Sequence, residues 1–346
     1  MTKVPLLLTG ATGYIGGTVL TRFLQRPDAS SFDIRLLVRS DEKAKAIQDL
    51  KLPVTVVIGS HTNAELMEQL ASQVDVVIAT ADCDSVEAAQ STLKGLKKRH
   101  EMTGKKPIFI HTSGTGVYAD LVNGKHADSE VFDDTNPKQI ESLPPTAPHR
   151  PVDLTIVAGD AEGYLHSYII LPSTVWGTAT GPLFDAKISN SHSIQIPYAA
   201  RAALARGQGG MLTEGKNVWP IVEIHELGDL YSLVYDAIQN KHPMAGHGRE
   251  GFYNAGHEEY SMRQLATSIS EVLVQVKRGT NPEPSSFTPE EREKYFGVCR
   301  FGPFFGSNSR CLSVRSKAIG WSPKKGLKEM LASVQYEIEA LIAKGL

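Results

Sequence analysis

The spacing of three glycines near the start of the chain constrains the fold more than any other feature of the sequence. Gly10, Gly13 and Gly16 stand three residues apart, after the apolar run Val4–Thr9 and before a stretch at 15–25 with helical periodicity. In such a strand, turn and helix, the first glycine permits the tight turn, the second lets the main chain approach a pyrophosphate, and the third lets the helix pack closely. The N–H groups and dipole at the helix start favour phosphate. The pattern therefore predicts a dinucleotide-binding turn.

Apolar runs and amphipathic stretches continue to alternate through the first half of the chain. Strands are expected at 33–39, 54–58, 74–80, 107–112 and 167–171, and helices at 42–50, 64–73, 85–100 and 151–163. Because the strand runs show no polar alternation and are separated by helices, they predict a parallel sheet covered on both faces. We expect an α/β protein with a Rossmann-like doubly wound sheet over 1–177. A smaller mixed α/β substrate lobe follows over 178–346, with segments at about 216–240 returning to the sheet.

Composition narrows the classes of partner. The 346 residues include 36 Lys and Arg against 38 Asp and Glu, a balance that disfavours nucleic acid or anionic membranes as partners. Cys83, Cys299 and Cys311 form neither a disulfide framework nor a metal motif, and the histidines show no ligand spacing, so no metal is expected. No run approaches the roughly 20 apolar residues of a membrane helix. A cytoplasmic protein with a small-molecule substrate is expected, and a homodimer stays open.

The end of the second predicted strand bears on the choice of cofactor. An acidic residue at this point binds the ribose hydroxyls of NAD(H), whereas an arginine accommodates the 2′-phosphate of NADP(H). The strand ends in Leu-Val-Arg-Ser, with Arg39 and Ser40 at the decisive positions, although Asp41 and Glu42 follow directly. The sequence therefore favours NADP(H) over NAD(H).

Several segments together resemble a known family. The sequence is similar to the extended and atypical short-chain dehydrogenase/reductases, and within them to fungal epimerase/dehydratase-like proteins. The resemblance covers nearly the whole chain and is carried by TGATGYIGG (9–17), LVRSDEKA (37–44), IFIHTSGT (108–115), IILPSTVWG (169–177), VEIHELGDL (222–230) and AIGWSPK (318–324).

The resemblance implies a set of cofactor contacts. Thr12, Tyr14 and Ile15 are implied to join the three glycines around the pyrophosphate. Further positions are implied near the nicotinamide: Ala79, Thr80 and Ala81 on one side, Thr112 and Ser113 beside them, and Pro172, Ser173, Thr174 and Val175 near the ring. Ser60 stands where such families often carry an aspartate near the adenine, so this chain departs from the pattern there.

The catalytic pattern of the family is absent. Its reductases use a serine or threonine with the tyrosine and lysine of a YxxxK motif, and no tyrosine of this chain has a lysine four residues later. Counting back from Pro172, His149 stands at the tyrosine position and Asp153 at the lysine position. Gly114 stands at the position of the usual serine, flanked by Ser113 and Thr115.

Two interpretations of His149 are open. In the first, His149 transfers the proton, Asp153 one helical turn later orients its imidazole, and Ser113 or Thr115 binds the substrate oxygen. In the second, His149 only precedes or caps a helix and Asp153 is a partner of the helix dipole, because Pro151 lies between them.

Three functions follow from these motifs. The first is an NADP(H)-dependent oxidoreductase acting on a carbonyl, a hydroxyl or an activated double bond of a small organic molecule. The second is an epimerase, dehydratase or isomerase that holds its nucleotide transiently or permanently. The third is a non-catalytic regulator that senses NADP(H), which the loss of YxxxK would permit.

Overall fold

The protein is built around a seven-stranded parallel sheet. The computed structural model describes residues 3–297 and 302–345, and Cys299 therefore lies outside the described residues. The strand order is β11-β7-β5-β4-β1-β2-β3, and every neighbouring pair runs parallel. The strands are β1 (Val4–Thr9), β2 (Phe32–Val38), β3 (Val54–Ile58), β4 (Val76–Ala79), β5 (Ile108–Thr112), β7 (His166–Pro172) and β11 (Phe252–Ala255). The α/β class and the doubly wound sheet are thus confirmed.

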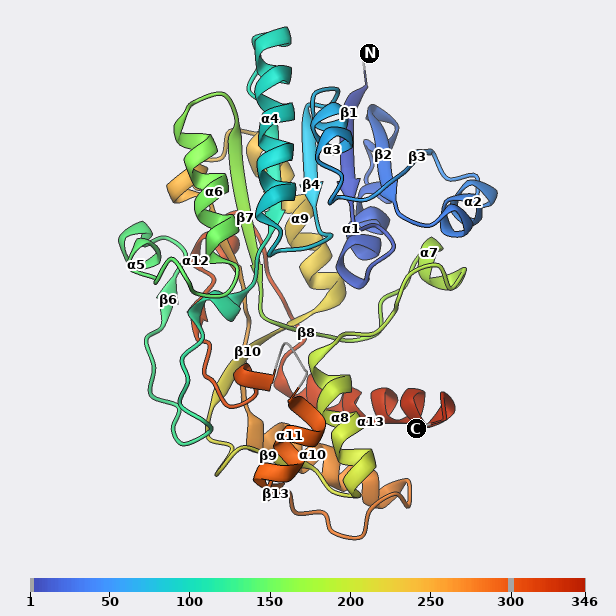
Figure 1. The fold of residues 1–346 in the computed structure, drawn as a ribbon, viewed down its shortest axis with the longest axis vertical. Coiled ribbons are helices and arrows are strands. Elements are labelled where there is room, and N and C mark those ends of the chain that lie inside the picture. Colours follow the sequence, from blue (N-terminus) through green and yellow to red (C-terminus); the bar gives the residue numbers. More distant parts are fainter. Residues whose placement is uncertain (1–2, 298–301, 346) are drawn as a thin grey trace.

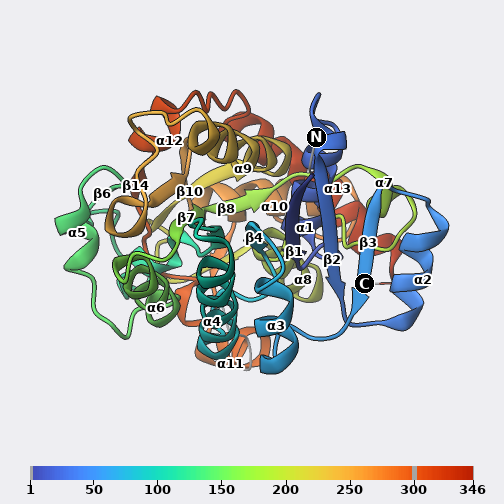
Figure 2. The same ribbon diagram turned by 90° about the horizontal axis from the view of Figure 1, so that it is seen from above.

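Helices cover both faces of this sheet (Figure 1 and Figure 2). One apolar cluster packs α1, α2 and α9 against it, and a second packs α3, α4 and α6 against it. The bounds are α1 (Tyr14–Leu24), α2 (Asp41–Asp49), α3 (Ala64–Ala71), α4 (Val86–Thr103), α6 (Arg150–Ala161) and α9 (Ile224–Gln239). Burial of strand residues on both sides explains why the strand sequences are continuously apolar.

A smaller region lies at the carboxyl ends of the central strands, in the lower half of Figure 1. Its three-stranded sheet has the order β12-β10-β8, and three longer helices share an apolar core with it. The bounds are β8 (Thr174–Trp176), β10 (Val218–Glu223), β12 (Glu259–Ser261), α8 (Gln195–Arg206), α10 (Met262–Gln275) and α13 (Leu327–Ala343). The shorter elements are β6 (Phe132–Asp133), β9 (Gly210–Met211), β13 (Ser285–Ser286), β14 (Cys311–Leu312), α5 (Pro137–Glu141), α7 (Pro182–Asp185), α11 (Pro289–Phe296) and α12 (Val314–Ala318).

The chain returns from this region to the central sheet through α9 and then β11. Helix α9 packs on α1, where a Cβ at Gly228 would lie 2.8 Å from Thr18, so the two helices approach closely. Arg22 pairs with Asp229 on the same contact, at 2.8 Å. Strand β11 then adds to the sheet beside β7. Of the segment at 216–240, α9 makes this return, whereas β10 pairs with β8 and β12. No helix within the described residues is long and apolar enough to cross a membrane.

The order of strands positions the functional cleft. From β1 the chain builds outward to β2 and β3, and it then crosses to the other side of β1 to form β4. The order therefore reverses between β1 and β4, and ligands of doubly wound sheets bind at the carboxyl ends of strands at such a point. Thr9 and Ala79 are paired in register at these ends, which places Gly10 beside Thr80.

Candidate active site

The glycine turn forms a cradle of main-chain groups. Gly10 has φ +78°, and the N–H of Gly13 donates to its carbonyl at 2.8 Å. Helix α1 begins at Tyr14, and Gly13 at its N-cap offers no side chain to the free N–H groups of the first turn. Free N–H groups of this kind, with the helix dipole behind them, suit a diphosphate.

The first and third glycines are required by packing against the end of β4. A Cβ at Gly10 would lie 2.7 Å from the Thr80 main chain, and one at Gly16 would clash with the Gly10 carbonyl and the Thr80 hydroxyl. By contrast, a Cβ at Gly13 would meet only the Gly10 carbonyl, at 3.1 Å. The middle glycine is therefore less closely packed than the other two, and it lines the cleft described next.

This turn forms one wall of a cleft of about 310 Å³. Six residues expected at the cofactor line it, namely Gly10, Thr12, Gly13, Arg39, Thr80 and Ala81. Six others line it as well: Thr9, Leu37, Lys43, Gly59, His61 and Asp82. Within the described residues, the side chains of Arg39 and Lys43 form no hydrogen bond or ion pair. Two cations without an ion-pair partner in the described residues therefore line the cleft at the end of β2, and Asp82 is the anion among the lining residues.

The side chains of four other expected cofactor residues bond or pack against other groups of the protein. Ser40 caps α2 by accepting the N–H of Lys43, and Ser60 bonds the hydroxyl of Thr62 at 2.8 Å. Tyr14 donates to the carbonyl of Gly177 at 2.5 Å, while Ile15 packs into the neighbouring apolar cluster. These side chains hold the turn and the strand ends in place.

The residues expected at the nicotinamide are likewise bonded internally. The Thr112 hydroxyl lies 2.6 Å from that of Tyr231, Ser173 donates to the carbonyl of Ala255, and Thr174 lies 3.3 Å from the hydroxyl of Tyr260. Two further positions offer no polar side chain: Pro172 ends β7, and Val175 packs beside Tyr14 and Ile15. Ala79 ends β4.

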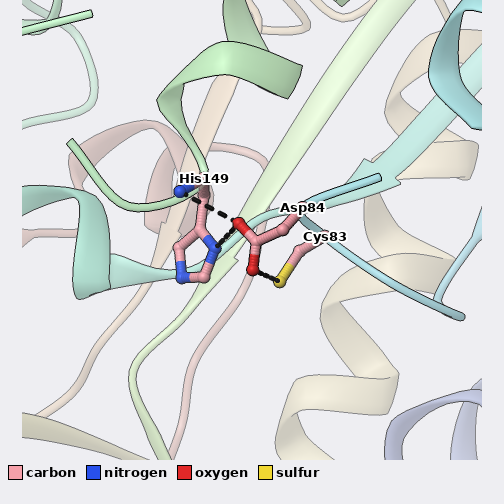
Figure 3. Close-up of side chains that lie close together, drawn as sticks. All are labelled: Cys83, Asp84 and His149. Carbon is pink, nitrogen blue, oxygen red and sulfur yellow. Dashed lines mark hydrogen bonds and ion pairs between the residues drawn. The ribbon is translucent and has the colours of Figure 1, made fainter. Parts of the chain in front are cut away.

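His149 lies at the same edge of the sheet, and its imidazole pairs with Asp84 (Figure 3). Its Nδ1 lies 2.8 Å from the Asp84 carboxylate, and its main-chain N–H donates to the same oxygen at 3.1 Å. The thiol of Cys83 donates to the other oxygen of Asp84 at 3.6 Å. The carboxylate that orients His149 is therefore Asp84, from the loop between β4 and α4, in place of the expected Asp153.

The backbone explains this exchange of partners. His149 has φ +66°, a left-handed conformation that is uncommon outside glycine and that Asn, Asp and His adopt more readily than other side chains. It stands at the N-cap of α6, and its side chain makes no cap hydrogen bond. The imidazole is thereby turned off the helix face that carries Asp153. Its Nε2 lies against the Gly114–Gly116 segment, close enough that a Cβ at either glycine would come within 3.2 Å.

The position of Nε2 explains why residue 114 is a glycine and not the serine of the family pattern. A side chain at residue 114 would crowd His149. Nε2 forms no hydrogen bond within the described part of the chain, and only 19% of the His149 side chain is exposed. One ring nitrogen is therefore held by a carboxylate, while the other lies beside Gly114 and Gly116 with no partner in the described residues.

Ser113 and Asp153 form a second pair behind His149. The Ser113 hydroxyl donates to Asp153 at 3.2 Å, and the other oxygen of this carboxylate has no partner in the described residues. Burial raises the pKa of Asp153 to about 6, against the opposing effects of Ser113 and of the nearby His149 and Arg150. Ser113 is thus engaged with Asp153 and not directed freely at a substrate.

Charge around His149 favours its protonated form. Burial by itself lowers the pKa of His149, but the hydrogen bond and charge of Cys83 and the charges of Asp153 and Asp82 outweigh it and raise the pKa. His111, on the adjacent β5, is fully buried, and burial lowers its pKa to about 3. Of these two histidines, His149 is the one that can carry a proton near neutral pH.

Asp84 and Cys83 were missed by the sequence analysis. A topological signal for them exists, because they follow β4 directly and the ends of parallel strands meet at one edge. Lys43, Gly59 and His61 were missed as well, although they follow the ends of β2 and β3 at the same edge.

Comparison with known proteins agrees with this architecture. Residues 2–96, which include the glycine turn, match the NmrA-like family. The chain is similar to the oxidase ucsJ of an Acremonium species, with 26% identity over 356 residues and 99% of both chains covered. The identity is low, but the alignment runs from end to end.

Solved structures share the fold. The dTDP-glucose 4,6-dehydratase DesIV of Streptomyces venezuelae, which was crystallised with NAD, superposes with a TM-score of 0.67 at 17% identity and covers 99% of this chain and 98% of its own. The UDP-glucose 4-epimerase of Thermotoga maritima has a TM-score of 0.63 at 18% identity, with 99% and 100% covered. The resemblance to NAD(P)-binding short-chain dehydrogenase/reductases of the extended type is thus confirmed in the fold.

Proposed function

We propose that the protein is an NADP(H)-dependent oxidoreductase that acts on a carbonyl, a hydroxyl or an activated double bond of a small organic molecule. One observation carries the proposal: Asp84 holds His149 at Nδ1, while Nε2 has no partner in the described residues and lies against the Gly114–Gly116 segment, which follows β5 at the same edge of the sheet as the dinucleotide turn. The Acremonium relative is described as an oxidase, which agrees with redox chemistry.

The chemistry divides between the cofactor and the chain. A bound nicotinamide supplies the hydride in reduction or accepts it in oxidation. In the reducing direction, His149 gives the proton on Nε2 to the substrate oxygen as the hydride adds to carbon, so that carbonyl becomes hydroxyl. The carboxylate of Asp84 holds the ring and stabilises its charged form. In oxidation His149 accepts the proton. The raised pKa of His149 favours the protonated form that donates in reduction.

NADP(H) is proposed over NAD(H) because of the cations at the end of β2. Arg39 and Lys43 line the cleft with no anionic partner in the described residues, although Asp41 and Glu42 stand in the first turn of α2. A 2′-phosphate would supply the missing charge. Charge-assisted hydrogen bonds of this type are roughly twice as strong as neutral ones.

The C-terminal region contains a small hollow of about 20 Å³, lined by residues without a formal charge: Gln195, Tyr198, Trp219, Tyr260, Met262, Leu265, Phe296, Phe304 and Phe305. This volume admits roughly one water molecule, so the hollow is too small to hold a substrate in this structure.

The test is turnover with His149 intact and replaced. We expect NADPH oxidation with at least one member of a panel of ketones, quinones and enones, and a loss on the order of 10²- to 10⁴-fold in His149→Asn. Asn is chosen because it tolerates the positive φ of this position. Calorimetry should show unchanged NADPH binding in the variant. Tight binding without turnover over the whole panel would instead favour a nucleotide sensor, and turnover without net NADPH oxidation an epimerase or dehydratase.

A further inference from the structure

A second group of ligand-type side chains lies at the opposite edge of the sheet from the cleft. Asp160 near the end of α6, His166 at the first position of β7 and His247 before the 3-10 turn Gly248–Glu250 bring one potential ligand atom each within 4.8 Å of one another. Strand β7 runs from His166 to Pro172 at the cleft, which separates the two edges by about 20 Å. The group therefore takes no part in the proposed reaction.

Asp160 is the fixed centre of this group. Its carboxylate is buried and accepts the N–H of Ser167 at 2.5 Å and Nδ1 of His247 at 2.9 Å. A Cβ at Gly248 would lie 2.8 Å from the carboxylate, so the His247 segment is packed directly against it. One carboxylate oxygen is thus held by the main chain while the other faces the imidazoles.

The two imidazoles are arranged for a shared partner. Their ring centroids are 3.9 Å apart and the planes are inclined by 76°. Neither nitrogen of the His166 ring has a hydrogen-bond partner within the described residues, and its Nδ1 is buried. The side chain of His247 is 42% exposed, which leaves a path from solvent.

We propose that Asp160, His166 and His247 form a binding site for a divalent zinc ion. Two neutral imidazoles and one carboxylate are a common zinc ligand set, which a water molecule completes to a tetrahedron. A simple His–Asp pair would explain Asp160 and His247, but it would leave His166 without a bonding partner. The three ligands come from separate elements, so their spacing along the sequence is not that of a metal motif.

Such an ion would stabilise the scaffold behind His149. Helix α6 begins directly after His149 and reaches the group through Asp160. A metal there would tie the end of α6 to the start of β7 and to the segment leading into β11. Ion binding to the folded state alone raises stability by mass action. Zinc should therefore raise the melting temperature without being required for turnover.

The experiment uses the full chain, stripped with a chelator and titrated with Zn²⁺ by calorimetry, with Co²⁺ absorption as a report on tetrahedral coordination. We expect one equivalent bound, a rise in melting temperature, and an affinity at least about 100-fold lower in His247→Gln and in His166→Ala. Cys83→Ser is the matched control, because Cys83, Asp84 and His149 form the other ligand-type group. It should bind zinc as the parent does.

Three outcomes would overturn the proposal: no stoichiometric binding, binding that survives the double variant His166→Ala/His247→Gln, or loss of binding in Cys83→Ser. Melting temperatures of the stripped variants show whether they fold. His247 is the safer position, because its side chain is partly exposed whereas Asp160 is buried. His247→Gln therefore carries the test if His166→Ala does not fold.

Discussion

The glycine turn and the start of α6 lie at the same edge of the central sheet but are built in different ways. The turn is closed mainly by contacts within residues 9–17 and by Thr80, with two further bonds from Tyr14 to Gly177 and from Ser189 to the carbonyl of Ala11. The α6 start depends on Asp84 from another loop, on Gly114 and Gly116 after β5, and on a left-handed residue. A phosphate cradle needs only main-chain groups in one local conformation, whereas a proton-transfer group needs side chains from several elements to converge.

The largest expected effect comes from a substitution that disrupts the glycine turn. Gly16→Ala places a methyl group against the Gly10 carbonyl and the Thr80 hydroxyl, and neither side can yield without moving β1 or β4. We expect a loss of about 3 kcal/mol or more in the free energy of unfolding, measured by urea denaturation.

Gly13→Ala is the matched control, since its φ of −93° suits alanine and only the Gly10 carbonyl is near. It should fold normally and bind NADP(H) at least about 10-fold more weakly, a change of roughly 1.4 kcal/mol. Equal stability of the two variants would show that the turn is not packed as described.

The second-largest expected effect concerns the start of α6, where side chains from several elements converge on His149. Asp84→Asn keeps the shape of the side chain but removes the charge that holds His149. We expect kcat to fall on the order of 10²-fold and the pH profile to change, with folding and NADPH affinity retained. Asp153→Asn is the contrasting variant and should reduce kcat less. If Asp153→Asn were the more damaging of the two, Asp153 would be the orienting residue after all.

These two regions also show how far sequence could lead. The first strand, the glycine turn and the third strand are encoded by local patterns. Arg39 could be predicted to line the cleft because it directly follows β2, whose end fixes its place. The expected pairing of His149 with Asp153 assumed helical geometry at residue 149. The positive φ there turns the ring toward Asp84, 65 residues away along the chain, and no periodicity in the sequence reports such a contact.

The pH dependence of stability sharpens the description of Asp153. Its pKa rises from the ordinary value of 3.8 to about 6 in the folded protein, chiefly by burial, so the folded state binds the proton more tightly than the unfolded state does. Its contribution to stability is therefore fully present below about pH 4 and is lost as the pH rises to about 6. Asp153→Asn should gain about 3 kcal/mol over the parent at pH 8 and nearly nothing at pH 4, in urea denaturation at both values. A constant difference at both pH values would contradict the buried, raised carboxyl.

The smallest expected effect concerns the choice between NADP(H) and NAD(H), at the residues that follow β2. Arg39 and Lys43 stand free at the cleft, and removal of one cation leaves the other, so the loss should be partial. We expect Arg39→Ala to weaken NADP+ binding about 10-fold, or roughly 1.4 kcal/mol, and to leave NAD+ binding nearly unchanged. Lys51→Ala is a suitable control, because Lys51 is an exposed cation that does not line the cleft. Calorimetry with both nucleotides measures the ratio. An equal loss for NAD+ and NADP+ would place Arg39 on the diphosphate and not on the 2′-phosphate, and it would leave the proposed preference without its main support.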